Sequence, residues 1–283
     1  MAYITTGAPL PLGADAVVES EQTEAGAAGA GSVRVKRRSA PGQDVRAIGS
    51  DAAAGEVLLR RGDVLGDAEL GALAMGGFPG ALVWPRPTVA VASTGSELRE
   101  PRGEEAGAAG GAPLRPGEVY DANRQVLLSA AADPLCGGAE AIDYGAWRDE
   151  AGPLEALLRR ALADEGVDVL VTSGGVSMGD RDLMKPLLAR LGRVHFGRLL
   201  MKPGKPTTFA TVERERATGA AAARPLLVFA LPGNPCSAFV TFHLLVAPAL
   251  RKLGGWLCPE PRRVQLVSSR IRCGAHRGAQ RSA

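Results

Sequence analysis

The chain has few aromatic side chains and only a small excess of charge of one sign. Of its 283 residues 46 % are hydrophobic but only 4 % are aromatic, so we expect a sizeable core built from Val, Leu and Ala. Lys and Arg number 33 against 30 Asp and Glu, a net charge of +3. This balance argues against a nucleic-acid partner, because such proteins carry a marked basic surplus. The basic residues between 262 and 281 are typical of a solvated segment.

Cysteine pairs, transmembrane runs and secretory signals are absent as well. The four cysteines are Cys136, Cys236, Cys258 and Cys273, and none forms a C-x-x-C pair or has a histidine at metal-ligand spacing. A thiolate metal site is therefore not expected. We expect a cytoplasmic protein whose cysteines are reduced. No apolar run has the length of a transmembrane helix, and no secretory signal opens the chain, so we expect no membrane span.

Signatures of nucleotide-binding loops and of nucleophilic triads are missing too. Neither a Walker A sequence nor a G-x-G-x-x-G turn at a strand–helix junction is present. His195, His243 and His276 stand isolated from one another in the sequence. The chemistry that this composition favours is the positioning of anions and a metal ion, rather than covalent catalysis.

The hydrophobic pattern changes near Pro87. Before it, short segments separated by Gly and Asp turns predict β-rich structure, with strands at 16–19, 33–35 and 56–59 and a short helix at 67–75. After it, strands are predicted at 88–92, 168–172, 194–201 and 226–230, and helices at 121–132, 154–165, 182–191 and 237–250. This alternation predicts an α/β fold with a doubly wound, mostly parallel sheet, preceded by a β-rich domain. Ligands of such sheets bind at the carboxyl ends of the strands.

Small, hydroxyl-rich or glycine-rich turns follow three of the predicted strands. They are Ser93–Glu97, Ser173–Asp180 and Leu231–Pro235. Turns of this kind expose backbone N–H groups that can bind phosphate, and glycine allows a close approach. Glycine turns after strands are common, so each turn alone is a weak signal. Three turns that converge on one edge of a sheet favour an anion site.

A cationic loop, Lys202–Pro206, follows the strand predicted at 194–201. Two prolines restrict its backbone, so its two lysines lose less entropy on binding. A small oxyanion is the ligand that this loop favours. The alternative is an exposed basic turn without a ligand, because exposed lysines are ordinary.

Carboxylates lie in the same region of the predicted sheet. They are Glu97, Asp121, Asp180 and Asp182. A carboxylate that faces bound phosphate would repel it unless a divalent cation lay between them, and Mg²⁺ commonly takes one or two carboxylates together with phosphate oxygens. The alternative for Asp121 is a cap at the start of the following helix.

These segments resemble a known family. The run from Thr172 to Asp180 resembles the signature of the molybdopterin-binding domain, which molybdopterin adenylyltransferases and molybdopterin molybdenumtransferases share. Four further blocks are similar to the second group, which includes the gephyrin E domain. They are Thr6–Pro11 with Gly13–Val18, Tyr120–Arg124, Lys202–Pro206 and Leu231–Pro235. The resemblance extends from Thr5 to Gly255.

The resemblance implies a reaction and its site. The family inserts molybdate into adenylylated molybdopterin, with a divalent cation, and releases AMP. By this resemblance the catalytic residues are Asp121, Glu97, Asp180 and Asp182, with Asp121 and Asp180 holding Mg²⁺. Molybdopterin nucleotide would be bound by Thr94, Gly95, Ser173, Gly174, Gly175, Ser177, Gly179, Pro232, Gly233 and Asn234. Molybdate would be bound by Lys202, Lys205, Pro206 and Ser237, and Thr6 and Asp51 would face the cleft from the β-rich domain.

The resemblance also implies a domain plan and partners. It assigns 1–55 to a partial β-rich domain, 56–86 to a connecting segment, 87–254 to the molybdopterin-binding domain and 255–283 to part of a C-terminal β domain with a basic tail. An Asp-Gly-Tyr-Ala-type segment and the rest of the C-terminal domain have no counterpart, so we expect a chain truncated at both ends. A homodimer, and an adenylyltransferase as partner or fusion, are the implied partners besides the small-molecule substrates.

Two other functions fit the same pattern. An adenylyltransferase shares the central domain, although the N-terminal third and the Lys202–Pro206 loop argue against it. A scaffold of the gephyrin type shares the domain, although nothing in the sequence identifies a peptide groove, and a remnant that binds ligand without turnover is consistent with the missing segments. The catalytic competence of the chain stays open at this point.

Overall fold

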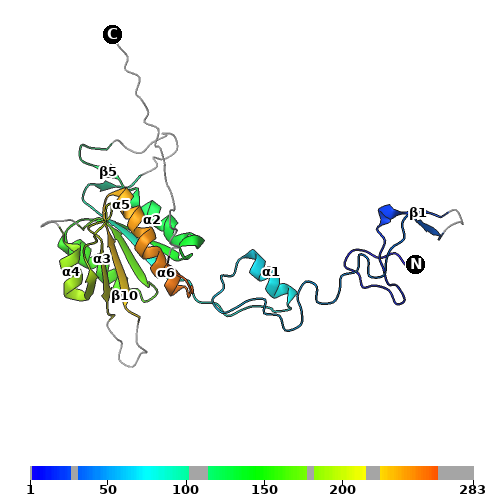
Figure 1. The fold of residues 1–283 in the computed structure, drawn as a ribbon. Coiled ribbons are helices and arrows are strands. Elements are labelled where there is room, and N and C mark those ends of the chain that lie inside the picture. Colours follow the sequence, from blue (N-terminus) through cyan, green and yellow to red (C-terminus); the bar gives the residue numbers. More distant parts are fainter. Residues whose placement is uncertain (1, 27–30, 102–113, 177–181, 215–223, 261–283) are drawn as a thin grey trace, which may run out of the picture. The chain divides into compact units, whose positions relative to one another are not determined.

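The computed structural model describes residues 2–26, 31–101, 114–176, 182–214 and 224–260. The chain forms two compact units, one of Met1–Arg61 with Leu65–Gly80 and one of Gly62–Val64 with Ala81–Ala283. Figure 1 shows the sheet and most of the helices in the second unit. The two units are described separately below. The division of the chain into four domains stays a prediction.

The first unit contains little regular structure within its described residues. A 3₁₀ turn, η1 (Ser20–Gln22), precedes the antiparallel strands β1 (Thr23–Ala25) and β2 (Val33–Val35). Helix α1 (Asp67–Met75) follows, and the backbone N–H of Gly66 donates to Glu69 Oε2 at its start (3.0 Å). The predicted strand at 33–35 and the predicted helix are therefore confirmed.

The strands predicted at 16–19 and 56–59 are wrong, and the first unit is less β-rich than expected. Residues 16–19 form no ladder: Val17 N–H donates to Gln43 O (3.1 Å), and Glu19 O accepts from Gln22 N–H (2.9 Å) in the turn that follows. Residues 56–59 join no strand in the described part of the chain. An apolar run becomes a strand only where a neighbouring strand accepts its hydrogen bonds, and the sequence pattern does not show that neighbour.

A mixed sheet forms the centre of the second unit. Its described strands lie in the order β6 (Glu140–Trp147), β3 (Thr88–Thr94), β7 (Val169–Ser173), β10 (Leu226–Leu231), β9 (Thr208–Val212) and β8 (Arg193–Phe196). The first four are parallel, whereas β9 and β8 are antiparallel to their neighbours. A separate parallel pair joins β4 (Leu98–Arg99) to β5 (Val119–Tyr120). The predicted mostly parallel α/β sheet is confirmed.

Two strands of this sheet were not predicted, and one was predicted too long. Strand β6 contains Asp143 and also Gly145, whose φ is +77°, beside an irregularity in its pairing with β3. These two residues interrupt the apolar run by which a buried strand is recognised. Strand β9 is short and follows closely after the Lys202–Pro206 loop. The strand predicted at 194–201 ends at Phe196, because the chain turns there toward that loop.

Helices cover both faces of the sheet (Figure 1). One face carries α3 (Ala151–Ala163) and α4 (Met184–Leu191). The other carries α2 (Asn123–Ala132), the 3₁₀ turn η2 (Pro134–Cys136), α5 (Pro235–Thr241), the π-helical turn η3 (Phe242–Val246) and α6 (Ala247–Leu253). All four predicted helices of this part are present, with shifted ends.

Side chains of β3 alternate between two hydrophobic cores. Ala90 and Ala92 pack with Leu154, Leu157 and Leu188 on the α3–α4 face. Val89 and Val91 pack with Leu127, Phe242 and Leu250 on the α2–α5–α6 face. Burial of each large aliphatic or aromatic side chain contributes about 1.5–3 kcal/mol, so both helical layers are firmly attached to the sheet.

The helical segment Pro235–Leu253 is more apolar than the sequence analysis predicted. By length and composition it could cross a membrane, and it is the one such segment among the described residues. Its inner side chains Phe242, Val246 and Leu250 are fully buried against the sheet. One face of this helix therefore packs on the sheet, although only 33 % of its apolar window is buried.

Candidate functional site at the carboxyl edge of the sheet

The carboxyl ends of β3, β7 and β10 lie next to one another. Ser93 of β3 pairs with Ser173 of β7, and Ser173 pairs with Leu231 of β10. The turns that follow the three strands therefore begin side by side. The structure therefore brings together the glycine-rich and hydroxyl-rich turns that were predicted to follow three of the strands.

The turn after β7 requires glycine at two positions. Gly174 has a φ of +96°, and a Cβ atom there would lie 2.1 Å from the backbone oxygen of Thr94. Gly175 has a φ of +67°, and its Cβ would lie 2.9 Å from Thr94 Oγ1. The backbone N–H of Gly174 donates to Leu231 O (3.0 Å) and joins this turn to β10. The predicted site residues Ser177, Gly179 and Asp180 lie outside the described residues.

Asp121 connects the start of α2 to β3. Its side chain is buried, at 2 % exposure. Oδ1 accepts hydrogen bonds from Ser93 Oγ (2.9 Å) and from the backbone N–H of Arg124 (3.2 Å), and Oδ2 accepts from Arg124 Nε (3.0 Å). Both carboxylate oxygens are therefore used within the protein, although the cap position of α2 is Ala122, one residue after Asp121. A direct contact of Asp121 with a metal ion stays a prediction.

Arg124 is a buried cation held by three carboxylates. It pairs with Asp121, with Asp143 of β6 (2.6 Å) and with Glu100 (2.7 Å). Burial alone would raise the pKa of Asp143, but hydrogen bonds and the charge of Arg124 outweigh it and lower that pKa. The ion pairs stay charged and fix the first turn of α2 against the sheet.

Asn123 links two of the three turns. Its Nδ2 donates to Ser173 Oγ (2.9 Å) and to Gly233 O (2.8 Å). These partners are 50 and 110 residues away in the sequence. Asn123 was not predicted as a site residue. The only signal for it was its position two residues after Asp121, within a block at a predicted helix start.

Three carboxylates lie on the α3–α4 side of the same edge. Glu97 is exposed in the turn after β3, and Asp182 Oδ1 accepts from the backbone N–H of Lys185 (3.1 Å). Asp149 was not predicted, because its importance depends on burial that the sequence does not show. Its Oδ1 is buried without a hydrogen-bond partner in the described structure. Burial, and then the nearby charges of Glu97 and Asp182, raise the pKa of Asp149.

This acidic cluster fits a divalent cation in its chemistry. An unsatisfied buried carboxylate oxygen beside two further carboxylates is an arrangement that a cation would stabilise. The described His, Cys, Asp and Glu side chains nevertheless form no group of three at metal-binding distance. A divalent cation at this cluster therefore stays a prediction.

The Lys202–Pro206 loop packs on α5. Gly204 is buried with a φ of +104°, and a Cβ atom there would lie 2.4 Å from Thr241 Cγ2. Thr207 Oγ1 donates to Gly204 O (2.7 Å), which closes the loop. Lys202 and Lys205 are exposed, and neither has a carboxylate partner among the described residues. The loop therefore presents two unpaired ammonium groups from a fixed backbone.

The start of α5 adds polar groups near this loop. Asn234 caps the helix, since its Oδ1 accepts from the backbone N–H (3.1 Å) and from Oγ (3.3 Å) of Ser237. Thr241 Oγ1 donates to Ser237 O (2.7 Å), and the same Thr241 contacts Gly204. The predicted molybdate residues Ser237 and Lys202–Pro206 are thus carried by one helix and the loop packed on it.

Comparison with known proteins agrees with this arrangement. Residues 90–252, more than half of the chain, match the family described as "Probable molybdopterin binding domain". The chain belongs to the molybdopterin-binding domain family. Residues 1–77 match a second family, described as the MoeA N-terminal region (domain I and II). The matched span of the molybdopterin-binding domain contains every described residue of the sheet-edge site.

Relatives of the molybdopterin-binding domain family are similar over most of this chain. Gephyrin of Dictyostelium discoideum is 39 % identical over 89 % of the chain and 35 % of its own length. Molybdopterin molybdenumtransferase 2 of Mycobacterium tuberculosis is 35 % identical over 92 % of the chain and 58 % of its own length. The solved MoeA protein of Pyrococcus horikoshii is 35 % identical, with a TM-score of 0.64, over 90 % of the chain and 56 % of its own. The chain therefore spans from a third to under three fifths of these relatives.

Thr6 and Asp51 belong to the first unit. Both are exposed, and Asp51 forms an ion pair with Arg46 (2.8 Å). Asp51 and Arg46 also line a pocket of about 330 Å³ within that unit. Their predicted part in the cleft stays a prediction.

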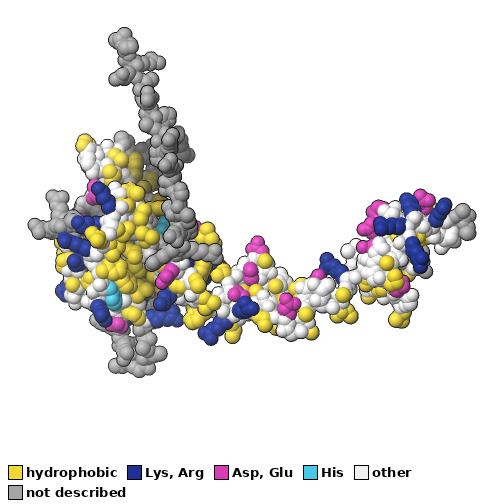
Figure 2. Space-filling view, in the orientation of Figure 1, with side chains coloured by type: hydrophobic (Ala, Val, Ile, Leu, Met, Phe, Trp, Pro, Cys, Tyr) yellow, Lys and Arg dark blue, Asp and Glu magenta, His cyan; other side chains and the backbone are white. Residues whose placement is uncertain are grey.

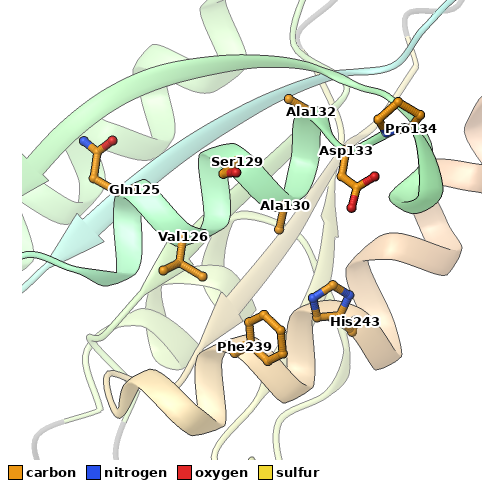
Figure 3. A pocket seen from close by; sticks show the side chains of 9 residues that line it. All are labelled: Gln125, Val126, Ser129, Ala130, Ala132, Asp133, Pro134, Phe239 and His243. Atoms are coloured by element: carbon orange, nitrogen blue, oxygen red, sulfur yellow. The ribbon is translucent and has the colours of Figure 1, made fainter.

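One pocket of the molybdopterin-binding domain is lined by none of the predicted site residues. It has a volume of about 760 Å³ and lies between α2 and the part of α5 and η3 that carries Phe239 and His243 (Figure 3). Hydrophobic side chains gather on the face that carries α5 and α6 (Figure 2). Asp133 and His243 are its only titratable lining residues among those described. The polar groups and glycine turns converge at the strand ends instead, so we place the candidate site there.

Proposed function

We propose that this chain binds adenylylated molybdopterin and molybdate, and that it serves the insertion of molybdenum with release of AMP. The observation that supports this most is one sheet edge that carries three glycine-rich or hydroxyl-rich turns, together with a lysine loop fixed on α5. The first feature suits a phosphorylated pterin nucleotide, and the second suits a small dianion. Relatives named molybdopterin molybdenumtransferase are consistent with both.

In this proposal the turns bind the phosphate region of the nucleotide. Backbone N–H groups and hydroxyls from Thr94–Gly95, Ser173–Gly175 and Pro232–Asn234 would donate to phosphate oxygens. Ser177 and Gly179 complete the predicted set. Molybdate would lie against Lys202 and Lys205, with Pro206 and Ser237 beside it. Such a placement brings the oxyanion next to the molybdopterin end of the nucleotide.

We propose Mg²⁺ as the cation at the acidic side of the edge. One or two of Glu97, Asp149, Asp180 and Asp182 would contact it directly, and the others would bind it through retained waters. When bound, it would neutralise charge between these carboxylates and the phosphate groups. Asp121 would act indirectly in this scheme, because its oxygens already bind Ser93 and Arg124. It would hold the start of α2 against the end of β3.

The remaining parts of the proposal concern assembly and location. We propose a homodimer, in which Thr6 and Asp51 of the first unit face a cleft. A molybdopterin adenylyltransferase, as a separate protein or a fused domain, would supply the adenylylated substrate. We place the protein in the cytoplasm, where its cysteines would remain reduced.

Gephyrin-type ligand binding without turnover is the second candidate. It rests on the 39 % identity to the protein named gephyrin in Dictyostelium discoideum. An adenylyltransferase remains a third candidate on the shared domain alone. Formation of adenylylated molybdopterin from ATP would favour the adenylyltransferase over the proposed transferase.

Molybdate binding to lysine variants tests the proposed oxyanion site. We expect the Lys202→Ala, Lys205→Ala double variant to bind molybdate at least about tenfold more weakly by calorimetry, because it loses two charge-assisted contacts. Lys252→Ala is the matched control, since this exposed lysine lies in the last turn of α6. Unchanged molybdate affinity in the double variant would place the oxyanion elsewhere.

A further inference from the structure

The side-chain amide of Asn123 has only one orientation consistent with its contacts. The backbone oxygen of Gly233 can only accept a hydrogen bond, so the amide atom 2.8 Å from it must be the NH₂ group. The same NH₂ group lies 2.9 Å from Ser173 Oγ. Its second proton is therefore donated to Ser173, whose oxygen acts as the acceptor.

This orientation leaves the hydroxyl proton of Ser173 available. The neighbouring Ser93 differs, because its hydroxyl donates to Asp121 Oδ1 (2.9 Å). No acceptor for the Ser173 hydroxyl occurs among the described residues, although the side chain is only 2 % exposed. A buried hydroxyl without an acceptor is unfavourable unless a ligand or water provides one. Ser173 lies at the start of the glycine turn where the proposed nucleotide phosphate would lie.

The neighbouring contacts keep Asn123 from moving. Arg124 attaches the first turn of α2 to Asp143 of β6 through an ion pair, and Asp121, which pairs with Arg124, accepts a hydrogen bond from Ser93 of β3. A Cβ atom built on Gly233 would lie 3.6 Å from Gly174 Cα, so the turns after β10 and β7 are in contact. Asn123 therefore donates to two turns that already touch and fixes their separation.

We infer that Asn123 is a positioning residue: it orients the Ser173 hydroxyl as a donor to an anionic ligand oxygen and sets the distance between the β7 and β10 turns. The inference rests on the proposed function, since it takes the ligand to be the phosphate of a pterin nucleotide. Asn123 itself need not touch that ligand. Asn123 therefore affects binding by orienting the Ser173 hydroxyl.

A double-mutant cycle tests this route. Asn123→Asp keeps the shape but replaces the donor by a carboxylate, to which Ser173 would donate instead of to the ligand. We expect about tenfold weaker binding of AMP and of adenylylated molybdopterin by calorimetry. In a Ser173→Ala background the same change should weaken binding by about twofold or less, because the hydroxyl is already gone. Gln125→Glu, an exposed amide-to-carboxylate change on the same helix, should leave binding unchanged.

The outcomes separate the inference from the proposed function. Equal losses in both backgrounds would show that Asn123 acts on the fold alone and would overturn the inference. Should Asn123→Asp fail to fold, as judged by its thermal unfolding, Asn123→Ala provides the same cycle without the added charge. Binding of both nucleotides by the parent chain with an additive cycle would overturn the inference only. No binding by the parent chain would contradict the proposed function and the inference with it.

Discussion

Hydrogen-bond partners distinguish two kinds of carboxylate at the sheet edge. Asp121 is buried and has partners at both oxygens, so it stabilises the junction of β3 and α2. Asp149 has a buried oxygen without a described partner, and its raised pKa reflects burial and two acidic neighbours. The sequence identified the first because it lies at a helix start. It could not identify the second, because nothing in the sequence shows which oxygen becomes buried.

The ionised Asp149 carboxylate should lower the free energy of unfolding at neutral pH. Its folded-state pKa is raised, so the stabilisation from its protonated form is present below the unfolded value of about 3.9 and is lost as the pH rises through the folded value. We therefore expect Asp149→Asn to melt a few degrees higher than the parent chain at pH 7. Below about pH 3.9 the two should melt together. Glu150→Gln, an exposed neighbour, serves as the control, and a lower melting temperature for Asp149→Asn at pH 7 would contradict this account.

At the scale of elements, strands with long apolar runs were predictable and strands that depend on a partner were not. Strands β3, β7 and β10 have buried runs that the sequence shows directly, and they carry the candidate site. Strand β6 was missed because Asp143 and Gly145 interrupt its run. In the first unit, apolar runs such as 56–59 were predicted as strands but have no neighbour to pair with among the described residues.

The Lys202–Pro206 loop should depend on its contact with α5. In Gly204→Ala the new methyl group would meet Thr241 at 2.4 Å, and the left-handed backbone would be strained. We expect the loop to shift and molybdate affinity to fall by about tenfold, while AMP affinity stays within about twofold. Calorimetric titration with each ligand measures both. Gly152→Ala in α3 is the control, since its methyl group meets no atom within 4 Å. Equal loss of both ligands would show a general defect rather than a local one.

For the whole molecule, the family was predictable from a few short motifs, whereas the homodimer that the resemblance implied stays a prediction. The runs at 172–180, 202–206 and 231–235 indicated the molybdopterin-binding domain, which the match over residues 90–252 confirms. Subunit contacts depend on surface complementarity between copies, and no short motif encodes that. The chain covers 58 % of the mycobacterial molybdenumtransferase, so its activity is the part of the proposal that most needs a direct test.

The most direct test is AMP release from adenylylated molybdopterin by the purified chain, with and without molybdate and Mg²⁺. The account predicts that release requires both molybdate and Mg²⁺, and that it falls at least about tenfold in the Lys202→Ala, Lys205→Ala variant. Release that is independent of molybdate, or retention of the bound nucleotide without any release, would contradict the proposed transferase reaction. Retention would instead support the gephyrin-type alternative of binding without turnover.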